Sequence, residues 1–261
     1  MTGVDLTRRR ELGELVEDTW RLFTSNLGLF LPIAVAIIVP VDLLVLGVGY
    51  GELWERYDAS PPAGEQATAL VLRFAVFQPL VTAAHIAAVM ALGRGERPTP
   101  WWSIARGMER GAAVIAVVLL TAAIVLLGLV CLIVPGIYFG VALYFSAQAV
   151  VAENRSPVDA LARSRELVRG QWWRVFGIGI VFSVMIGLTT ALLSAGMSAV
   201  AAAADVQAFA LLGSMIGDVL SIAFTALAAT LVFFDLRARQ EGIPPPPRWA
   251  PAGWEAPGQG F

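Results

Sequence analysis

The sequence has no lysine, one cysteine, one histidine and few charged residues of either sign. Charged residues make up 15% of the 261 residues and hydrophobic residues 57%. A soluble domain has about 25% charged residues and about 45–50% hydrophobic residues. The lone Cys131 excludes an internal disulfide. The lone His85 has no cysteine or acidic residue close to it in the sequence, which argues against a metal centre.

Catalytic signatures are also missing. The sequence contains no G-x-S-x-G motif, no glycine-rich phosphate loop and no histidine paired with a glutamate at helical spacing. No block of acidic or basic residues indicates a nucleic-acid partner. We therefore expect a protein that is not an enzyme, with no catalytic residue, no metal and no cofactor.

The hydrophobic residues that are present are gathered in six runs. About 20 apolar residues cross the hydrocarbon of a bilayer as a helix, so each run predicts a membrane span. The third and fourth runs are separated only by Val134, Pro135 and Gly136, a turn signal that predicts a tight hairpin. We predict an all-α, polytopic membrane protein with six transmembrane helices in three pairs. The runs cover residues 27–48, 67–92, 111–133, 137–151, 175–204 and 208–234.

Two domains are expected. Residues 1–235 form the six-helix membrane domain, and residues 236–261, rich in proline and glycine, form a disordered cytoplasmic tail. Sixteen of the 18 arginines lie before the first run, after the last run, or in the loops that follow the second and fourth runs. The positive-inside rule places these segments, and both termini, in the cytoplasm. The use of arginine alone hints at a bacterial origin, so we expect a multi-pass protein of the bacterial plasma (inner) membrane.

An amphipathic helix is expected just before the first, third and fifth spans. The first covers residues 12–23, where apolar side chains recur at helical spacing. The second has Thr99 as its cap and Pro100 in its first position, and its apolar side is formed by Trp101, Ile104, Ala105, Met108 and Ala112. The third has Ser156 as cap, followed by Pro157 and Asp159.

Tryptophan and arginine side by side in such helices are typical of the lipid headgroup region. Two interpretations stay open: binding of lipid headgroups, or ordinary anchoring of helix ends at the membrane surface. The candidate headgroup or interfacial residues are Trp20, Arg21, Trp101, Trp102, Arg163, Arg165, Arg169, Trp172 and Trp173.

Four ionisable residues lie within the spans, where charge is costly and function is suspected. Asp42 and Arg73 lie at similar depth in the outer parts of the first two spans, which predicts an ion pair; alternatively, each side chain reaches interfacial water by itself. Asp218 follows a GxxxG pattern and is either a proton or cation site or a protonated or hydrogen-bonded packing residue. We expect His85 to be a satisfied polar contact.

The stretch from Pro135 to Ile180 resembles a known family. Its features are Pro135-Gly136-Ile137-Tyr138, Glu153 at a span end, Ala160-Leu161-Ala162-Arg163-Ser164, and Trp172-Trp173. Together with Phe234-Asp235-Leu236-Arg237, they resemble the bacterial glycerophosphoryl diester phosphodiesterase membrane-domain family and its six-span relatives. Some members of that family carry a separate catalytic phosphodiesterase domain. We expect none here, because the metal ligands of such a domain are missing from this sequence.

Two functional hypotheses follow. The first is a non-enzymatic membrane protein that organises or binds membrane lipids or a membrane protein partner. The alternative is a small transporter or channel subunit that uses Asp42, Arg73 and Asp218. An intramembrane enzyme would lack a paired nucleophile and base. A cavity shared by the three charges would favour transport, whereas local partners for each would weaken it. The oligomeric state stays open.

Overall fold

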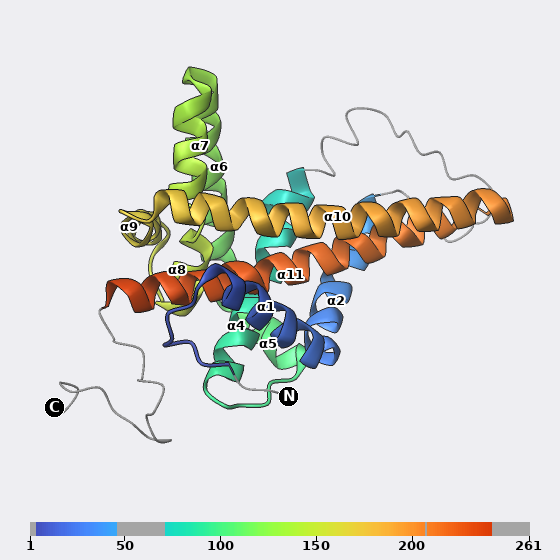
Figure 1. Ribbon diagram of the computed structural model, residues 1–261, viewed down its shortest axis with the longest axis horizontal. Coiled ribbons are helices and arrows are strands. Elements are labelled where there is room, and N and C mark those ends of the chain that lie inside the picture. Colours follow the sequence, from blue (N-terminus) through green and yellow to red (C-terminus); the bar gives the residue numbers. More distant parts are fainter. Residues whose placement is uncertain (1–3, 46–70, 207, 242–261) are drawn as a thin grey trace.

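The structure is a computed structural model that describes residues 4–45, 71–206 and 208–241. The described residues form helices and no strands, as the sequence predicts (Figure 1). The helices are α1 (Leu12–Ser25), α2 (Leu27–Val45), the π-helix η1 (Arg73–Phe77), α4 (Gln78–Gly93), α5 (Pro100–Met108), α6 (Gly111–Cys131), α7 (Ile133–Ala142), α8 (Ser146–Ala152), α9 (Pro157–Val168), α10 (Trp172–Ala204) and α11 (Ala208–Gln240).

Five helical segments are long and apolar enough to cross a membrane. Helices α1 and α2 meet at a bend of 80° and give a sixth span if they are counted as one broken span. The protein is therefore a multi-pass membrane protein, as its hydrophobic runs predict. The five segments are Arg73–Gly93, Gly111–Cys131, Ile133–Ala152, Trp172–Ala204 and Leu212–Gln240.

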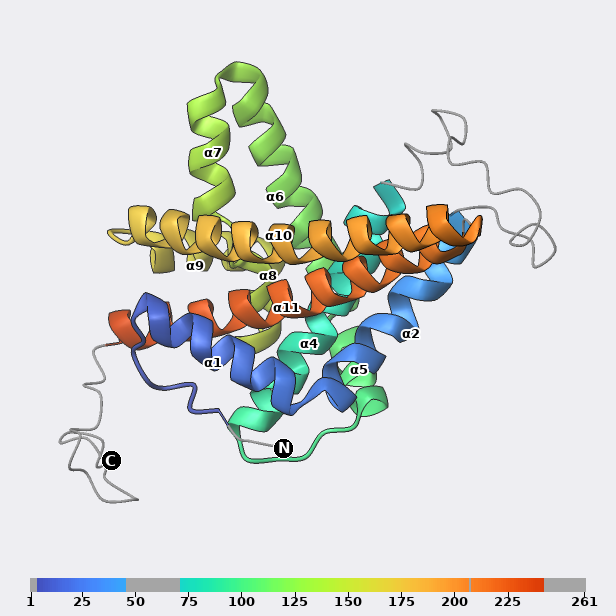
Figure 2. The ribbon, with the colours of Figure 1, turned by 45° about the vertical axis from the view of Figure 1, so that its right-hand side comes forward.

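The two helical hairpins, α6–α7 and α10–α11, point in different directions. Helices α10 and α11 lie side by side along most of their length, and the α6–α7 hairpin stands away from them in both views (Figures 1 and 2). The expected hairpin between α6 and α7 is present, but its turn lies at Leu132, and Pro135 and Gly136 lie inside α7 and not in the turn. Helix α11 continues to Gln240, beyond the expected domain boundary at residue 235. The rest of the expected tail, from residue 242, lies outside the described residues.

The three expected amphipathic helices are present as α1, α5 and α9, and two caps confirm their sequence signals. The Thr99 hydroxyl accepts a hydrogen bond from the backbone N–H of Trp102 at 3.2 Å, and the Ser156 hydroxyl accepts one from Asp159 at 3.3 Å. Each cap satisfies a backbone donor that the first turn of a helix leaves without a partner. Proline occupies the start of both helices, where its missing N–H costs nothing.

The side that α5 packs inward differs from its apolar side. Ser103 and Gly107 are buried, while Trp101 is 72% exposed. A Cβ on Gly107 would lie 2.5 Å from the backbone nitrogen of Ala84, so α5 packs against α4 through its small residues. The aromatic side is thereby left facing outward, where lipid would surround it.

The fourth span is not one continuous helix. It breaks between the end of α7 and the start of α8, and a serine of α9 occupies the break. The Ser164 hydroxyl donates to the backbone oxygen of Ala142 at 2.9 Å and accepts from the backbone N–H of Phe145 at 3.1 Å. Because unpaired backbone groups are costly away from water, this serine stabilises an interruption that the apolar run did not predict.

Candidate functional site

The intramembrane charges do not gather around a described cavity. Arg73 begins η1, and its guanidinium lies 2.5 Å from the carboxylate of Asp218 in α11. The side chain of Asp42 lies outside the described part of α2, so the predicted Asp42–Arg73 pair stays a prediction. The described cavities are lined by other residues. Arg73 and Asp218 thus compensate each other's charge.

The GxxxG pattern beside Asp218 permits close approach of α11 to α10. A Cβ on Gly213 would lie 2.4 Å from the Cβ of Met197 in α10. Gly217 faces Thr190 of the same helix at ordinary contact distance. Only the absence of a side chain at Gly213 lets the two long helices pack there, so this pattern has a packing role.

His85 is fully buried in α4. Its Nδ1 lies 2.8 Å from the backbone oxygen of Val81, and its ring stacks on Phe30 with 5.8 Å between ring centroids. No group of three or more His, Cys, Asp or Glu side chains among the described residues could hold a metal ion. Only one of the two ring nitrogens of His85 has a partner, because the buried Nε2 has no hydrogen-bond partner among the described residues, so the satisfied polar contact expected from the sequence is present only in part.

A groove of about 540 Å³ lies between α7, α10 and α11. Its walls are apolar over most of their area; among the lining residues that the structure describes, only Ser183, Thr225 and Tyr144 bear a hydroxyl group. Two glycines, Gly140 of α7 and Gly179 of α10, line it, and a Cβ added to either would meet no atom within 4 Å. The groove follows from the divergence of the two hairpins and has the chemistry of a site for hydrocarbon.

Aromatic side chains are clustered at one end of this groove. The Trp172 ring stacks on Phe176, a groove residue, with 5.1 Å between centroids, and on Tyr138 of α7 with 6.2 Å. The indole N–H of Trp172 donates to the backbone oxygen of Tyr138 at 3.3 Å. Trp173 is 78% exposed beside it. Such a cluster of amphipathic rings is typical of the membrane–water interface.

The arginines of α9 differ in their partners. The guanidinium of Arg163 lies 2.9 Å from Glu153, 3.1 Å from Glu166 and 3.3 Å from Glu241, and its side chain is nearly buried. Arg165 and Arg169 are exposed at the end of the helix, and the structure gives their guanidinium groups no partner among the described residues. A lipid phosphate would have to compete for Arg163, whereas Arg165 and Arg169 are accessible.

Glu153 is held as a carboxylate by this arrangement. Burial by itself raises the pKa of Glu153. The hydrogen bonds and positive charges of Arg163 and Arg155 together lower it by more than burial raises it, so that the pKa lies below its ordinary value. The contact joins the end of α8 to the middle of α9 and so fixes the elbow between them.

The remaining interfacial candidates lie on α1 and α5. Trp20 is exposed, and its ring meets the edge of Phe224 with 6.4 Å between centroids. Arg21 pairs with Asp18 on the same helix. Trp101 and Trp102 are exposed on the outward side of α5. The structure therefore does not bring all nine candidates together.

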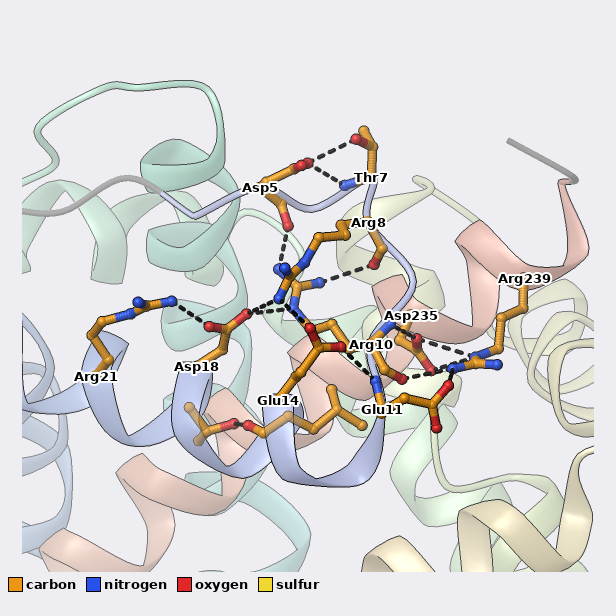
Figure 3. A network of polar contacts seen from close by, with 12 residues as sticks. Asp5, Thr7, Arg8, Arg10, Glu11, Glu14, Asp18, Arg21, Asp235 and Arg239 are labelled. Carbon is orange, nitrogen blue, oxygen red and sulfur yellow. Dashed lines mark hydrogen bonds and ion pairs between the residues drawn. The ribbon is translucent and has the colours of Figure 1, made fainter. Parts of the chain in front are cut away.

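A cluster of buried charges was missed by sequence reasoning (Figure 3). Arg10 is 1% exposed, and its Nε lies 2.8 Å from Asp18, while its backbone N–H donates to Asp235 at 2.6 Å. Asp235, fully buried near the end of α11, also accepts from Arg174 at 2.6 Å and from Arg239 at 3.1 Å. We call these five residues the terminal clamp, because they bind the N-terminal segment to α11.

The carbonyl oxygen of Arg10 completes the terminal clamp. It accepts hydrogen bonds from Arg174 at 2.7 Å and from Arg239 at 2.6 Å, the same two side chains that pair with Asp235. The only sequence signals were the arginine run that contains Arg10 and the Phe234-Asp235-Leu236-Arg237 motif, which entered through the resemblance alone. Neither indicates which residues meet.

The comparisons with known proteins give one result. A family model described as a domain of unknown function (DUF7847) matches residues 65–235. No curated protein and no solved structure matches the chain. The resemblance to the phosphodiesterase membrane-domain family is not what this match names, so it stays a prediction. Because the matched region spans more than half of the chain, this protein belongs to the DUF7847 family.

Proposed function

We propose that this protein is a non-enzymatic module of the bacterial plasma membrane that binds an anionic lipid in the groove between α7, α10 and α11. The observation that carries this proposal is the coincidence of an apolar groove with aromatic rings at one of its ends, at Trp172, where α10 begins just after the exposed arginines of α9. An anionic phospholipid has matching parts in the same order: acyl chains, a glycerol region at the membrane interface, and a charged headgroup.

The acyl chains account for most of the affinity in this proposal. Hydrocarbon in the groove would contact the apolar walls that Gly140 and Gly179 leave open. Without such a chain the groove walls would face a void, and their atoms would lack the dispersion attraction that neighbouring atoms supply. A lipid bound here would therefore also stabilise the angle between the α6–α7 and α10–α11 hairpins, which the groove separates.

The headgroup would lie against the end of α9. Arg165 and Arg169 present guanidinium groups that suit phosphate oxygens, and Trp173 can lie at the level of the glycerol backbone. With both termini and the α9 segment cytoplasmic, as the arginine distribution predicts, the lipid would come from the cytoplasmic leaflet. That leaflet carries the anionic lipids to which arginine binds.

Native mass spectrometry of the protein released from lipid nanodiscs that contain phosphatidylglycerol tests this proposal. Gly179→Leu fills the groove, and Gly177→Leu is its control, since Gly177 is two residues away on the same helix, has equal space for a Cβ and does not line the groove. We expect Gly179→Leu to abolish retained lipid and Gly177→Leu to keep it. Equal retention in both variants would overturn the proposal.

A second comparison tests the headgroup contact. Arg165→Ala with Arg169→Ala should lower retained phosphatidylglycerol by about tenfold or more, because one charge-assisted hydrogen bond contributes about 1.5 kcal/mol. Arg237→Ala is the control, since Arg237 is bound to Glu241 at 2.9 Å and lies on another helix. An equal loss in the control would point to general charge and not to this site.

The transporter alternative is supported less well. It requires Asp42, Arg73 and Asp218 to face one pathway, whereas Arg73 and Asp218 have each other as local partners. A measurable ion or solute flux in proteoliposomes that falls with Asp218→Asn would favour transport over the lipid-binding module.

A further inference from the structure

A second hollow, of about 350 Å³, lies on the other side of the fourth span from the groove. It is lined by residues of η1, α4, α6, α8 and α11, and it adjoins the groove at Tyr144, Thr225 and Ala229, which line both. Unlike the groove, it has two amide side chains among the polar residues of its walls. Those polar residues are Gln78, Thr82, Tyr144, Gln148 and Thr225.

The two glutamines have unsatisfied hydrogen-bonding capacity. The side-chain oxygens of Gln78 and Gln148 are both buried and have no hydrogen-bond partner among the described residues. Gln148 as a whole is 2% exposed. Thr82, by contrast, donates its hydroxyl to the backbone oxygen of Gln78 at 2.9 Å. Buried amides nearly always find partners, so two orphaned amide oxygens on one hollow point to a bound molecule.

Both glutamines follow directly on an irregularity of the helix backbone. Gln78 is the first residue after the π-helix η1, a conformation that is rare and frequent at functional sites. Gln148 lies in the first turn of α8, just after the break that Ser164 stabilises. Two separate departures from regular helix therefore place two amides on the same hollow, where an uninterrupted helix would have other faces inward.

The chemistry of the walls selects the ligand. Among the described lining residues none is acidic or basic, and a charge placed among them would have no compensating partner. An amide both accepts and donates hydrogen bonds, and so does a hydroxyl group. We propose that this hollow binds a neutral molecule with free hydroxyl groups, held by Gln78 and Gln148.

Such hydroxyl groups come from two sources, a free polyol or the glycerol end of a neutral lipid. The test uses the full chain in nanodiscs, with 1,2-dioctanoylglycerol as the hydroxyl-bearing lipid and trioctanoylglycerol as its counterpart without a free hydroxyl. Native mass spectrometry measures the retained lipid, with and without an excess of glycerol. The proposal predicts that dioctanoylglycerol is retained at least about tenfold better than trioctanoylglycerol, the effect of roughly one buried hydrogen bond to a hydroxyl.

Two kinds of variant identify the site. Gln148→Leu removes the amide at nearly constant volume and should abolish the preference for dioctanoylglycerol. Ala122→Phe fills the hollow from α6, and Ala123→Phe, on the neighbouring exposed position that does not line it, is the matched control. The proposal requires loss in the first two variants and retention in the third.

The outcomes separate the two sources and this site from the groove. If excess glycerol displaces dioctanoylglycerol, or itself binds with the same dependence on Gln148, a free polyol shares the site; if it does not, the lipid is the ligand. Equal retention of the two glycerides, or retention unchanged by Gln148→Leu, overturns the proposal. Gly179→Leu must leave this binding intact, because loss there would place the glyceride in the groove.

Discussion

Replacement of Asp235 by asparagine should destabilise the protein strongly, because it removes the anionic centre of the terminal clamp. The carboxylate is fully buried and accepts from the backbone N–H of Arg10 at 2.6 Å and from the guanidinium groups of Arg174 and Arg239 at 2.6 and 3.1 Å. Removal of one member of a buried charge pair costs about 3–5 kcal/mol. The side chains of Arg174 and Arg239 are 21% and 22% exposed, and water partly compensates them, so we expect about 3 kcal/mol.

The assay is the thermal unfolding midpoint of the purified protein in detergent. A protein of this size loses about 2–4 °C per kcal/mol, so the midpoint of Asp235→Asn should fall by about 6–12 °C. Asp205→Asn is the matched control, since Asp205 is exposed in a left-handed turn that asparagine also adopts. If the two variants unfold within about 1 °C of each other, the clamp does not hold the fold together as its geometry implies.

Three further predictions concern the helix break, the α8–α9 elbow and the intramembrane pair. Ser164→Ala leaves two backbone groups of the break without a partner and should cost about 1–3 kcal/mol of unfolding free energy, measured by the same assay; an unchanged midpoint would contradict it. Because the pKa of Glu153 is below its ordinary value of 4.5 in the folded protein, its ion pair with Arg163 contributes fully at neutral pH and is lost as the pH falls below 4.5. The midpoint should therefore fall more steeply with acid in the wild type than in Glu153→Gln, and parallel curves would refute this. Exchange of charges, Arg73→Asp with Asp218→Arg, should restore stability that either single variant loses, with a coupling of about 0.5–3 kcal/mol in a double-mutant cycle; a double variant no better than the singles would exclude a direct pair.

The spans and the helix caps could be predicted because their signals are local. An apolar run determines its own preference for the bilayer, whatever lies beside it. Thr99 before Pro100, and Ser156 before Pro157, need only the next turn of chain to form a cap, and both formed. The fold class follows from these signals alone.

The partners of the charges could not be predicted in the same way. Depth along a span was the basis for pairing Arg73 with Asp42, and that pair stays a prediction because the side chain of Asp42 lies outside the described residues. Depth alone did not indicate that Arg73 also meets a residue far along the chain. The structure gives Arg73 a partner in α11. Ser164 entered only through the motif that carries the family resemblance, because nothing near it in sequence marks the break that it fills.

The terminal clamp also sets an order of events during synthesis. Arg10 and Asp235 are 225 positions apart in the chain, so the segment that contains Arg10 is synthesised well before α11, and its buried contact forms only after α11 is present. Bringing together two segments so far apart in sequence costs conformational entropy, and the stabilising contacts form only after that cost has been met. Until then the backbone N–H of Arg10 and the guanidinium of Arg174 lack the carboxylate of Asp235. A nascent chain that stops short of α11 therefore carries, in Arg174, an arginine without its acidic partner, a chemical mark that disappears once α11 is in place.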